Sequence, residues 1–164
     1  MIVYLNGAFL PLEEARIPVL DRGFIYGDGV YEYIPVYRRQ AFRLPQHLAR
    51  LQHSLDGIRL GNPHTDAEWA SIIMELVGRQ PFDDQGVYFQ VTRGVAKRDH
   101  AFPAGVTPTV FMMSNPLATP SAEQVERGGE LGELGQCGCA LPGEASLAGR
   151  VLVRRDLPVG PDLE

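Results

Sequence analysis

The order in which strand-like and helix-like segments follow one another most constrains the fold of this 164-residue chain. Residues 2–10 predict a hairpin, because apolar runs flank Asn6-Gly7, a pair that tolerates positive φ. Two strands follow, then two helices, then two more strands, with the strands predicted over 30–37, 41–44, 86–94 and 109–114. Strands and helices in separate blocks predict an α+β fold, a two-layer sandwich of a mostly antiparallel sheet with two helices on one face.

Both helices are predicted from apolar residues at helical spacing. Pro45 begins the first helix, whose buried face carries Leu48, Leu51, Leu55 and Ile58. Thr65 and Glu68 form a capping box at the start of the second helix, which Gly78 ends.

The composition is that of a soluble globular protein, with 45% hydrophobic and 21% charged residues. A formal net charge of -5 argues against a nucleic-acid binder. No apolar run approaches the roughly 20 residues of a membrane span and no signal pattern begins the chain, so we expect a cytoplasmic protein. Cys137 and Cys139 are one residue apart, which suits neither a disulfide nor a zinc site. No Ser-His-Asp constellation, P-loop or metal-ligand cluster appears in the sequence.

The chain changes character after residue 118. Every aromatic residue lies at or before Phe111, and residues 128–164 are rich in glycine, without lysine and without sustained periodicity. Such a segment buries too little apolar surface to offset the entropy lost on ordering. We therefore expect a domain over residues 1–118, a linker over 119–127 and a poorly ordered tail over 128–164.

A glycine-rich run from Asp21 to Glu32 precedes the strand at 30–37, with glycines at positions 23, 27 and 29. A backbone of this kind turns sharply and can approach a ligand closely. Taken alone, the run is more simply a tight structural turn. We interpret its acids Asp28 and Glu32 as structural.

Three side chains suit the binding of anions. Arg50 is predicted near a helix N-terminus, where the guanidinium and the helix dipole together suit a phosphate. Arg98 and His100 stand on a loop after a strand and suit a carboxylate between them. The alternatives are a surface arginine at position 50 and a solvated loop around Arg98.

The run from Asp21 to Glu32 (DRGFIYGDGVYE) resembles the signature of the class IV, fold-type IV aminotransferases, which use pyridoxal 5′-phosphate. Residues 47–51 (HLARL), 87–94 (VYFQVTRG) and 98–103 (RDHAFP) match as well, the last of them closest to D-amino-acid transaminase. The resemblance covers about residues 1–118 and implies the N-terminal domain of that fold. It implies transfer of an amino group between a D-amino acid such as D-alanine and a 2-oxo acid such as 2-oxoglutarate.

The resemblance also implies roles for individual residues. Arg50 matches the arginine that grips the cofactor phosphate. Tyr31, Arg98 and His100 match the family's trap for the substrate α-carboxylate. Tyr33 stands where the family has a residue beside the substrate, and its bulk is expected to narrow the pocket. The family takes the arginine and histidine of the trap from the partner subunit, so the resemblance implies a homodimer.

The sequence departs from the family in its second half. The chemistry needs a lysine for a Schiff base with the cofactor and an acid paired with the pyridine nitrogen. The sole lysine, Lys97, lies in the substrate-binding loop, and we interpret it as a solvated charge. We therefore expect an intact N-terminal domain up to about residue 127, then an out-of-frame or otherwise unrelated tail. By this interpretation the chain contains no catalytic lysine and is inactive alone.

Two alternatives stay open. Within the enzymes, the chain is a branched-chain aminotransferase or an aminodeoxychorismate lyase, against which Arg98 and His100 argue. Outside the enzymes, it is a non-catalytic domain that pairs with another subunit or weakly binds anionic ligands.

Overall fold

Six strands pair into one antiparallel sheet in residues 1–117, the part of the chain that this computed structural model describes. The strands are β1 (Ile2–Leu5), β2 (Ala8–Pro11), β3 (Gly29–Tyr37), β4 (Gln40–Ala41), β5 (Gln85–Thr92) and β6 (Thr109–Pro116), in the spatial order β2-β1-β6-β5-β3-β4. The predicted linker over 119–127 and tail over 128–164 lie outside the described residues.

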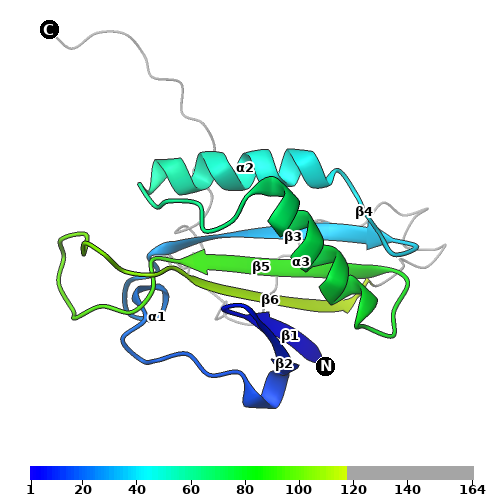
Figure 1. Cartoon of the computed structure of the whole chain (residues 1–164), viewed down its shortest axis with the longest axis horizontal. Coiled ribbons are helices and arrows are strands. Elements are labelled where there is room, and N and C mark those ends of the chain that lie inside the picture. The colour runs from blue at the N-terminus through cyan, green and yellow to red at the C-terminus, as the bar shows by residue number, and fades with distance from the viewer. Residues whose placement is uncertain (118–164) are drawn as a thin grey trace, which may run out of the picture. The chain divides into compact units, whose positions relative to one another are not determined.

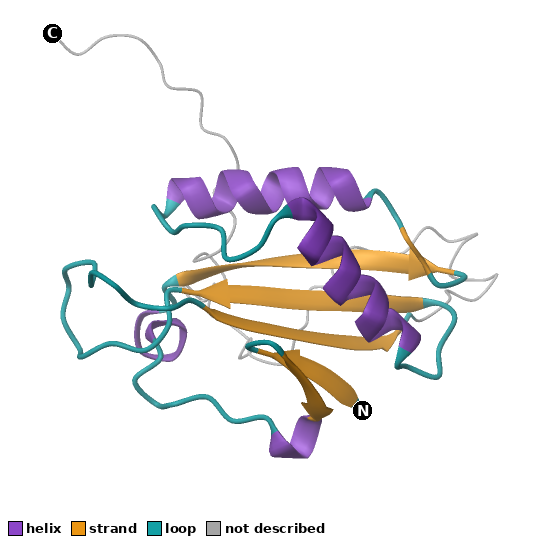
Figure 2. Cartoon of the chain, in the orientation of Figure 1, coloured by secondary structure: helices purple, strands orange, loops and turns teal. Residues whose placement is uncertain are grey.

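The helices are η1 (Leu12–Glu14), α1 (Arg22–Tyr26), α2 (Leu44–Gly57) and α3 (Asp66–Gly78). Figure 1 shows α2 along β3 and α3 crossing the central strands, and Figure 2 shows the same two layers as helix and strand. The predicted α+β sandwich is confirmed. No helix in residues 1–117 is long and apolar enough to cross a membrane.

The core lies between the sheet and these two helices. Alternate residues of β3, Val30, Ile34 and Val36, are buried with the apolar stripe of α2, Leu48, Leu51 and Leu55. Trp69 of α3 is fully buried, and its indole N–H donates to Asn62 Oδ1 at 2.9 Å. The apolar spacing that predicted the helices therefore marks the faces that they bury.

Helix α3 begins and ends where the sequence predicts, whereas the chain just before α2 differs from the prediction. Thr65 and Glu68 form the reciprocal capping box at the start of α3. The strand expected over 41–44 is reduced to β4, because Arg43 adopts a left-handed conformation (φ 50°) and the helix already begins at Leu44.

The glycine-rich run forms a helix that the sequence did not predict. The carboxylate of Asp21 accepts the Gly23 N–H at 2.8 Å and so begins α1, and Gly27 ends it at φ 66°. Five residues are too few to display a helical period. Gly29 then pairs with β5, where a Cβ on it would lie 2.7 Å from the Val91 carbonyl oxygen. The close approach at Gly29 is thus between two strands.

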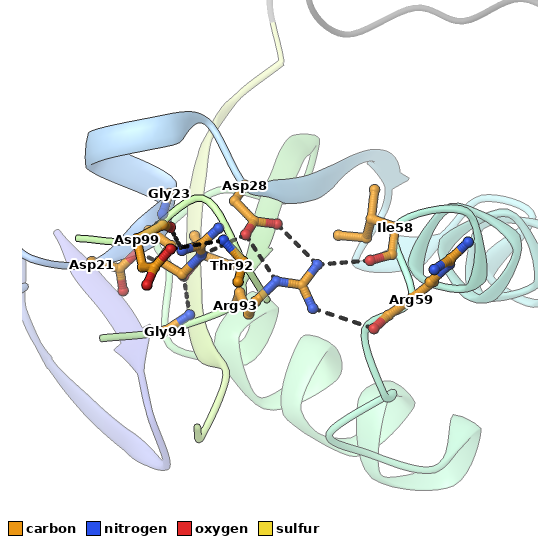
Figure 3. A network of polar contacts seen from close by, with 11 residues as sticks. Asp21, Gly23, Asp28, Ile58, Arg59, Thr92, Arg93, Gly94 and Asp99 are labelled. Atoms are coloured by element: carbon orange, nitrogen blue, oxygen red, sulfur yellow. Dashed lines mark hydrogen bonds and ion pairs between the residues drawn. The ribbon is translucent and has the colours of Figure 1, made fainter. Parts of the chain in front are cut away.

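A carboxylate joins the ends of β3, β5, α1 and α2. Asp28 accepts hydrogen bonds from Arg22 Nε (2.7 Å) and from Arg93 Nε (2.8 Å) and Nη2 (3.0 Å). Arg93 also donates to the Ile58 and Arg59 carbonyls, just beyond the last residue of α2 (Figure 3). Burial alone would raise the pKa of Asp28, but the hydrogen bonds and charges of the two arginines outweigh it and hold that pKa below its ordinary value.

The surroundings of Gly27 and Gly29 predict different losses of stability when each glycine is replaced by alanine. We expect Gly29→Ala to lower the free energy of unfolding by about 3 kcal/mol, because the Cβ would overlap the backbone of β5. Gly27→Ala should cost only about 1 kcal/mol, for the left-handed conformation in open space. Urea denaturation of the two variants measures the difference. An equal or larger penalty at Gly27 would contradict the close-approach account.

The Asp28 ion pairs predict a pH-dependent stability. Because the folded pKa is depressed, the contribution is complete above the ordinary carboxyl pKa and is lost as pH falls through the folded value. At pH 7 Asp28→Asn should cost about 3 kcal/mol, and the difference from wild type should shrink below about pH 4. The control is Glu13→Gln, which removes an exposed carboxyl and should cost little at either pH. A pH-independent penalty for Asp28→Asn would refute this assignment.

Candidate functional site

The sheet face opposite α2 and α3 carries a row of tyrosines. Tyr31 and Tyr33 alternate with the buried residues of β3 and are 41% and 42% exposed. Tyr31 stacks on Tyr88 of β5, with ring centroids 5.6 Å apart, and the Tyr88 hydroxyl donates to Gln90 Oε1 at 2.9 Å. Burial, and secondly the neighbouring Tyr31, raise the pKa of Tyr88, so its hydroxyl stays protonated at neutral pH.

The Tyr33 ring lies directly over Gly86 of β5. The residue that pairs with Tyr33 on β5 is Tyr88, two residues after Gly86. A Cβ on Gly86 would overlap the hydroxyl end of the Tyr33 ring. The absent side chain at position 86 therefore creates the space in which the Tyr33 ring lies across the strand.

Arg50 projects from α2 and is held by a buried carboxylate. Its Nε donates to Glu32 Oε1 at 2.6 Å and its Nη2 donates to Glu32 Oε2, a two-pronged ion pair. His47 Nδ1 lies 2.8 Å from the same Oε2. The Glu32 side chain is 2% exposed, whereas that of Arg50 is 62% exposed. The inner edge of the guanidinium is thus fixed while its outer edge faces solvent.

The electrostatics keep Arg50 charged. The hydrogen bond to Glu32 raises the pKa of Arg50 above its ordinary value, desolvation opposes this, and the charge of Glu32 adds to it. The position on the helix differs from the prediction. Because α2 begins at Leu44, Arg50 lies beyond the first turn, where the helix dipole no longer acts. The dipole expected to assist Arg50 is therefore not available, and Glu32 is the group that orients it.

The sequence reasoning missed the pairing of Glu32 with Arg50. A signal was present, because Val30, Ile34 and Val36 alternate around Glu32 and place it on the buried face of β3. A buried carboxylate requires a cation or several donors. That requirement predicts a partner on the helix that covers β3, although it does not name which side chain.

Arg98 and His100 lie on the loop between β5 and β6, and both contact one ring of α1. The Arg98 guanidinium is 5.4 Å from the centroid of the Tyr26 ring, and the His100 ring is 5.8 Å from it. Both residues, and Lys97 before them, are exposed. Within residues 1–117 no hydrogen bond or ring contact joins Arg98 or His100 to the Tyr31 or Arg50 group.

The predicted residues thus form two groups in one chain. Arg50, fixed by Glu32, offers an oriented and mostly exposed cation. Arg98 and His100 offer a cation and an imidazole on an exposed loop. Each group is suited to an anion, and neither contains a nucleophile set beside a base.

Comparison with known proteins identifies the family of this chain. The sequence pattern of the amino-transferase class IV family matches residues 29–134. The D-alanine aminotransferase of Bacillus licheniformis is 40% identical over 124 residues, which are 76% of this chain and 44% of that protein. That of Staphylococcus haemolyticus is 37% identical over 110 residues, 67% of this chain and 39% of that protein. The chain spans less than half the length of these relatives.

Solved structures give the same answer for the fold. The branched-chain aminotransferase of Escherichia coli matches with a TM-score of 0.68 and 22% identity, over 74% of this chain and 42% of that one, which shows the fold alone. The branched-chain aminotransferase of Thermoproteus uzoniensis with norvaline has a TM-score of 0.63 and 29% identity, over 73% and 41%. The 4-amino-4-deoxychorismate lyase of Pseudomonas aeruginosa has a TM-score of 0.64 and 26% identity, over 77% and 44%. With a family match across more than half of its residues, the chain belongs to the class IV aminotransferases.

Proposed function

We propose that this chain contains the N-terminal domain of an aminotransferase that moves an amino group between a D-amino acid of the D-alanine type and a 2-oxo acid of the 2-oxoglutarate type. The observation that carries the proposal is the Arg50 guanidinium, fixed on one edge by buried Glu32 and exposed on the other. The similarity to D-alanine aminotransferases supports the choice of substrate.

Arg50 fits the phosphate group of pyridoxal 5′-phosphate. Glu32 engages Nε and Nη2, and Nη2 also lies 3.3 Å from His47 Nδ1, whereas Nη1 has no hydrogen-bond partner in residues 1–117 and can donate its two N–H groups to phosphate oxygens. Fixing the side chain before the ligand arrives lowers the entropy lost on binding. When bound, the cofactor supplies the electron-withdrawing ring that amino transfer requires.

Tyr31, Arg98 and His100 are proposed to bind the α-carboxylate of the substrate, and Tyr33 to limit the space beside it. A guanidinium and an imidazole suit a carboxylate, and the Tyr31 hydroxyl adds a neutral donor. Because Arg98 and His100 lie on Tyr26 and make no contact with Tyr31 in the described chain, we propose that a second copy supplies them, in a homodimer. A cytoplasmic location stays a prediction.

We propose that residues 1–164 do not catalyse transamination by themselves. The division into a domain over 1–118, a linker over 119–127 and a tail over 128–164 is part of this proposal, as is the unrelated origin of the tail. Lys97 is the one lysine in the sequence, and it is exposed on the loop between β5 and β6. A solvated lysine on an exposed loop lacks the burial or neighbouring base that activates a catalytic amine.

The role of Arg50 predicts a phosphate-dependent affinity. Pyridoxamine 5′-phosphate should bind residues 1–164 more tightly than pyridoxamine, and Arg50→Lys should weaken the phosphate form about tenfold, because a lysine cannot keep both the Glu32 pair and a two-pronged phosphate contact. Isothermal titration measures both ligands. Arg43→Lys, at the start of the same helix, is the control and should change neither affinity. Equal affinities for the two ligands in wild type would contradict the phosphate site.

If the chain is inactive alone, as proposed, it should catalyse no measurable transamination. Residues 1–164 mixed with pyridoxal 5′-phosphate, D-alanine and 2-oxoglutarate should form pyruvate no faster than the cofactor without protein. A lactate dehydrogenase-coupled assay measures the rate. Turnover above that background, abolished by Lys97→Ala, would assign the catalytic amine to Lys97 and overturn the proposal.

The alternatives within the family differ in their amino donor. The fold is shared with branched-chain aminotransferases and with an aminodeoxychorismate lyase, so the architecture does not separate them. A protein that carries these residues together with a complete second domain should use D-alanine in preference to L-leucine. Preference for L-leucine would favour the branched-chain alternative.

A further inference from the structure

Residues 97–105, the part of the β5–β6 loop that carries Arg98 and His100, have one hydrogen bond to the rest of the described domain, beside the packing of the Phe102 ring on the Arg93 guanidinium (4.0 Å). Arg22 Nη1 donates to the carbonyl of Asp99 at 2.8 Å. In residues 1–117 this is the hydrogen bond that joins residues 97–105 to the chain outside the loop. Asp99 stands between Arg98 and His100, so the attachment is made at the centre of the proposed carboxylate-binding pair.

Arg22 is itself held rigidly. It is 3% exposed, its Nε is paired with Asp28 at 2.7 Å, and its guanidinium lies 4.6 Å from the centroid of the Tyr26 ring. Arg93 holds Asp28 from the other side. A guanidinium fixed in this way presents Nη1 in one direction, and the loop backbone must meet it there.

Tyr26 completes the support one helical turn after Arg22. Its ring contacts Arg98 and His100, the side chains on either side of Asp99. The same ring also contacts Arg22, which donates to the Asp99 carbonyl. The Tyr26 hydroxyl is buried and has no hydrogen-bond partner in the described residues. The ring, rather than the hydroxyl, is therefore the part of Tyr26 that acts.

We infer that Arg22 and Tyr26 are positioning residues, which set the orientation of Arg98 and His100 through the Asp99 carbonyl and the Tyr26 ring. That the oriented pair binds a carboxylate rests on the proposed function. Helix α1 therefore does more than join η1 to β3, because its Arg22 and Tyr26 side chains both contact the same loop. Neither residue is expected to touch the substrate.

Proteolysis of the full chain, residues 1–164, tests whether the hydrogen bond from Arg22 to the Asp99 carbonyl holds the loop in place. Arg22→Lys keeps a cation beside Asp28 but lacks the planar fork that reaches two acceptors. We expect trypsin to cleave after Lys97 and Arg98 about tenfold faster in Arg22→Lys than in wild type, because loss of a charged hydrogen bond raises the population of the open loop. Arg39→Lys is the control. Arg39 likewise joins a carboxylate, Asp83, to the Gln80 carbonyl, and its replacement should leave the cleavage rate unchanged.

Measurements of ligand affinity distinguish a positioning role of Arg22 from a general effect on stability. The ring signals of His100 in NMR spectra report titration with pyruvate, and those of His47, beside Arg50, report pyridoxamine 5′-phosphate. Arg22→Lys should weaken pyruvate binding about tenfold and leave pyridoxamine 5′-phosphate binding unchanged. Unchanged cleavage, or faster cleavage with unchanged pyruvate affinity, would overturn the inference. If wild type shows no pyruvate response, the proposed carboxylate site fails, while the cleavage rates still decide whether Arg22 holds the loop.

Tyr26 gives a second test that does not depend on the Asp28 ion pairs. Tyr26→Phe keeps the ring and removes only the hydroxyl, so its cleavage rate and pyruvate affinity should equal those of wild type. Tyr26→Ala removes the ring and should behave like Arg22→Lys. Equal behaviour of the phenylalanine and alanine variants would refute the role of the ring.

Discussion

One partly shielded carboxylate, Asp28, holds two buried guanidinium groups, and the ends of four elements meet around it. Transferring two cations from water to the protein interior costs several kcal/mol each, and one carboxylate balances only one of them. Backbone carbonyls provide the rest. Arg93 donates to Ile58 and Arg59 at the C-terminal end of α2, where the helix dipole is negative, and Arg22 donates to Asp99. The cluster is satisfied only when α2, β3, β5 and the loop after β5 are all in place.

Glu32 also pairs with an arginine, but that arginine is exposed rather than buried. Both carboxylates are shielded and both bind arginine, but the arginines of Asp28 are buried while Arg50 is mostly exposed. A buried guanidinium has its donors engaged by the protein and serves the fold. A guanidinium clamped along one edge keeps donors free, and the carboxylate beneath it prevents rotation. The difference in exposure separates a structural arginine from one available to a ligand.

Local patterns in the sequence were sufficient for most of the fold and for little of the site. The Asn6-Gly7 hairpin, the Thr65 capping box and the alternation of β5 are encoded by neighbouring residues, and each is found within two residues of its predicted position. The short helix α1 was missed because five residues contain barely more than one turn. The contacts of Arg50 with Glu32 and of Arg22 with Asp99 join residues 18 and 77 positions apart, and no local periodicity encodes such pairs. The resemblance identified Arg50, but its orienting partner came from the three-dimensional arrangement.

The packing of Tyr33 over Gly86 also links these two positions. A Cβ at position 86 would overlap the hydroxyl end of the Tyr33 ring, so a side chain there requires that exposed ring to turn away from β5. A smaller residue at position 33 removes this requirement. The cost of a side chain at 86 therefore depends on which residue stands at 33, and the effects of substitutions at the two positions on stability are not additive.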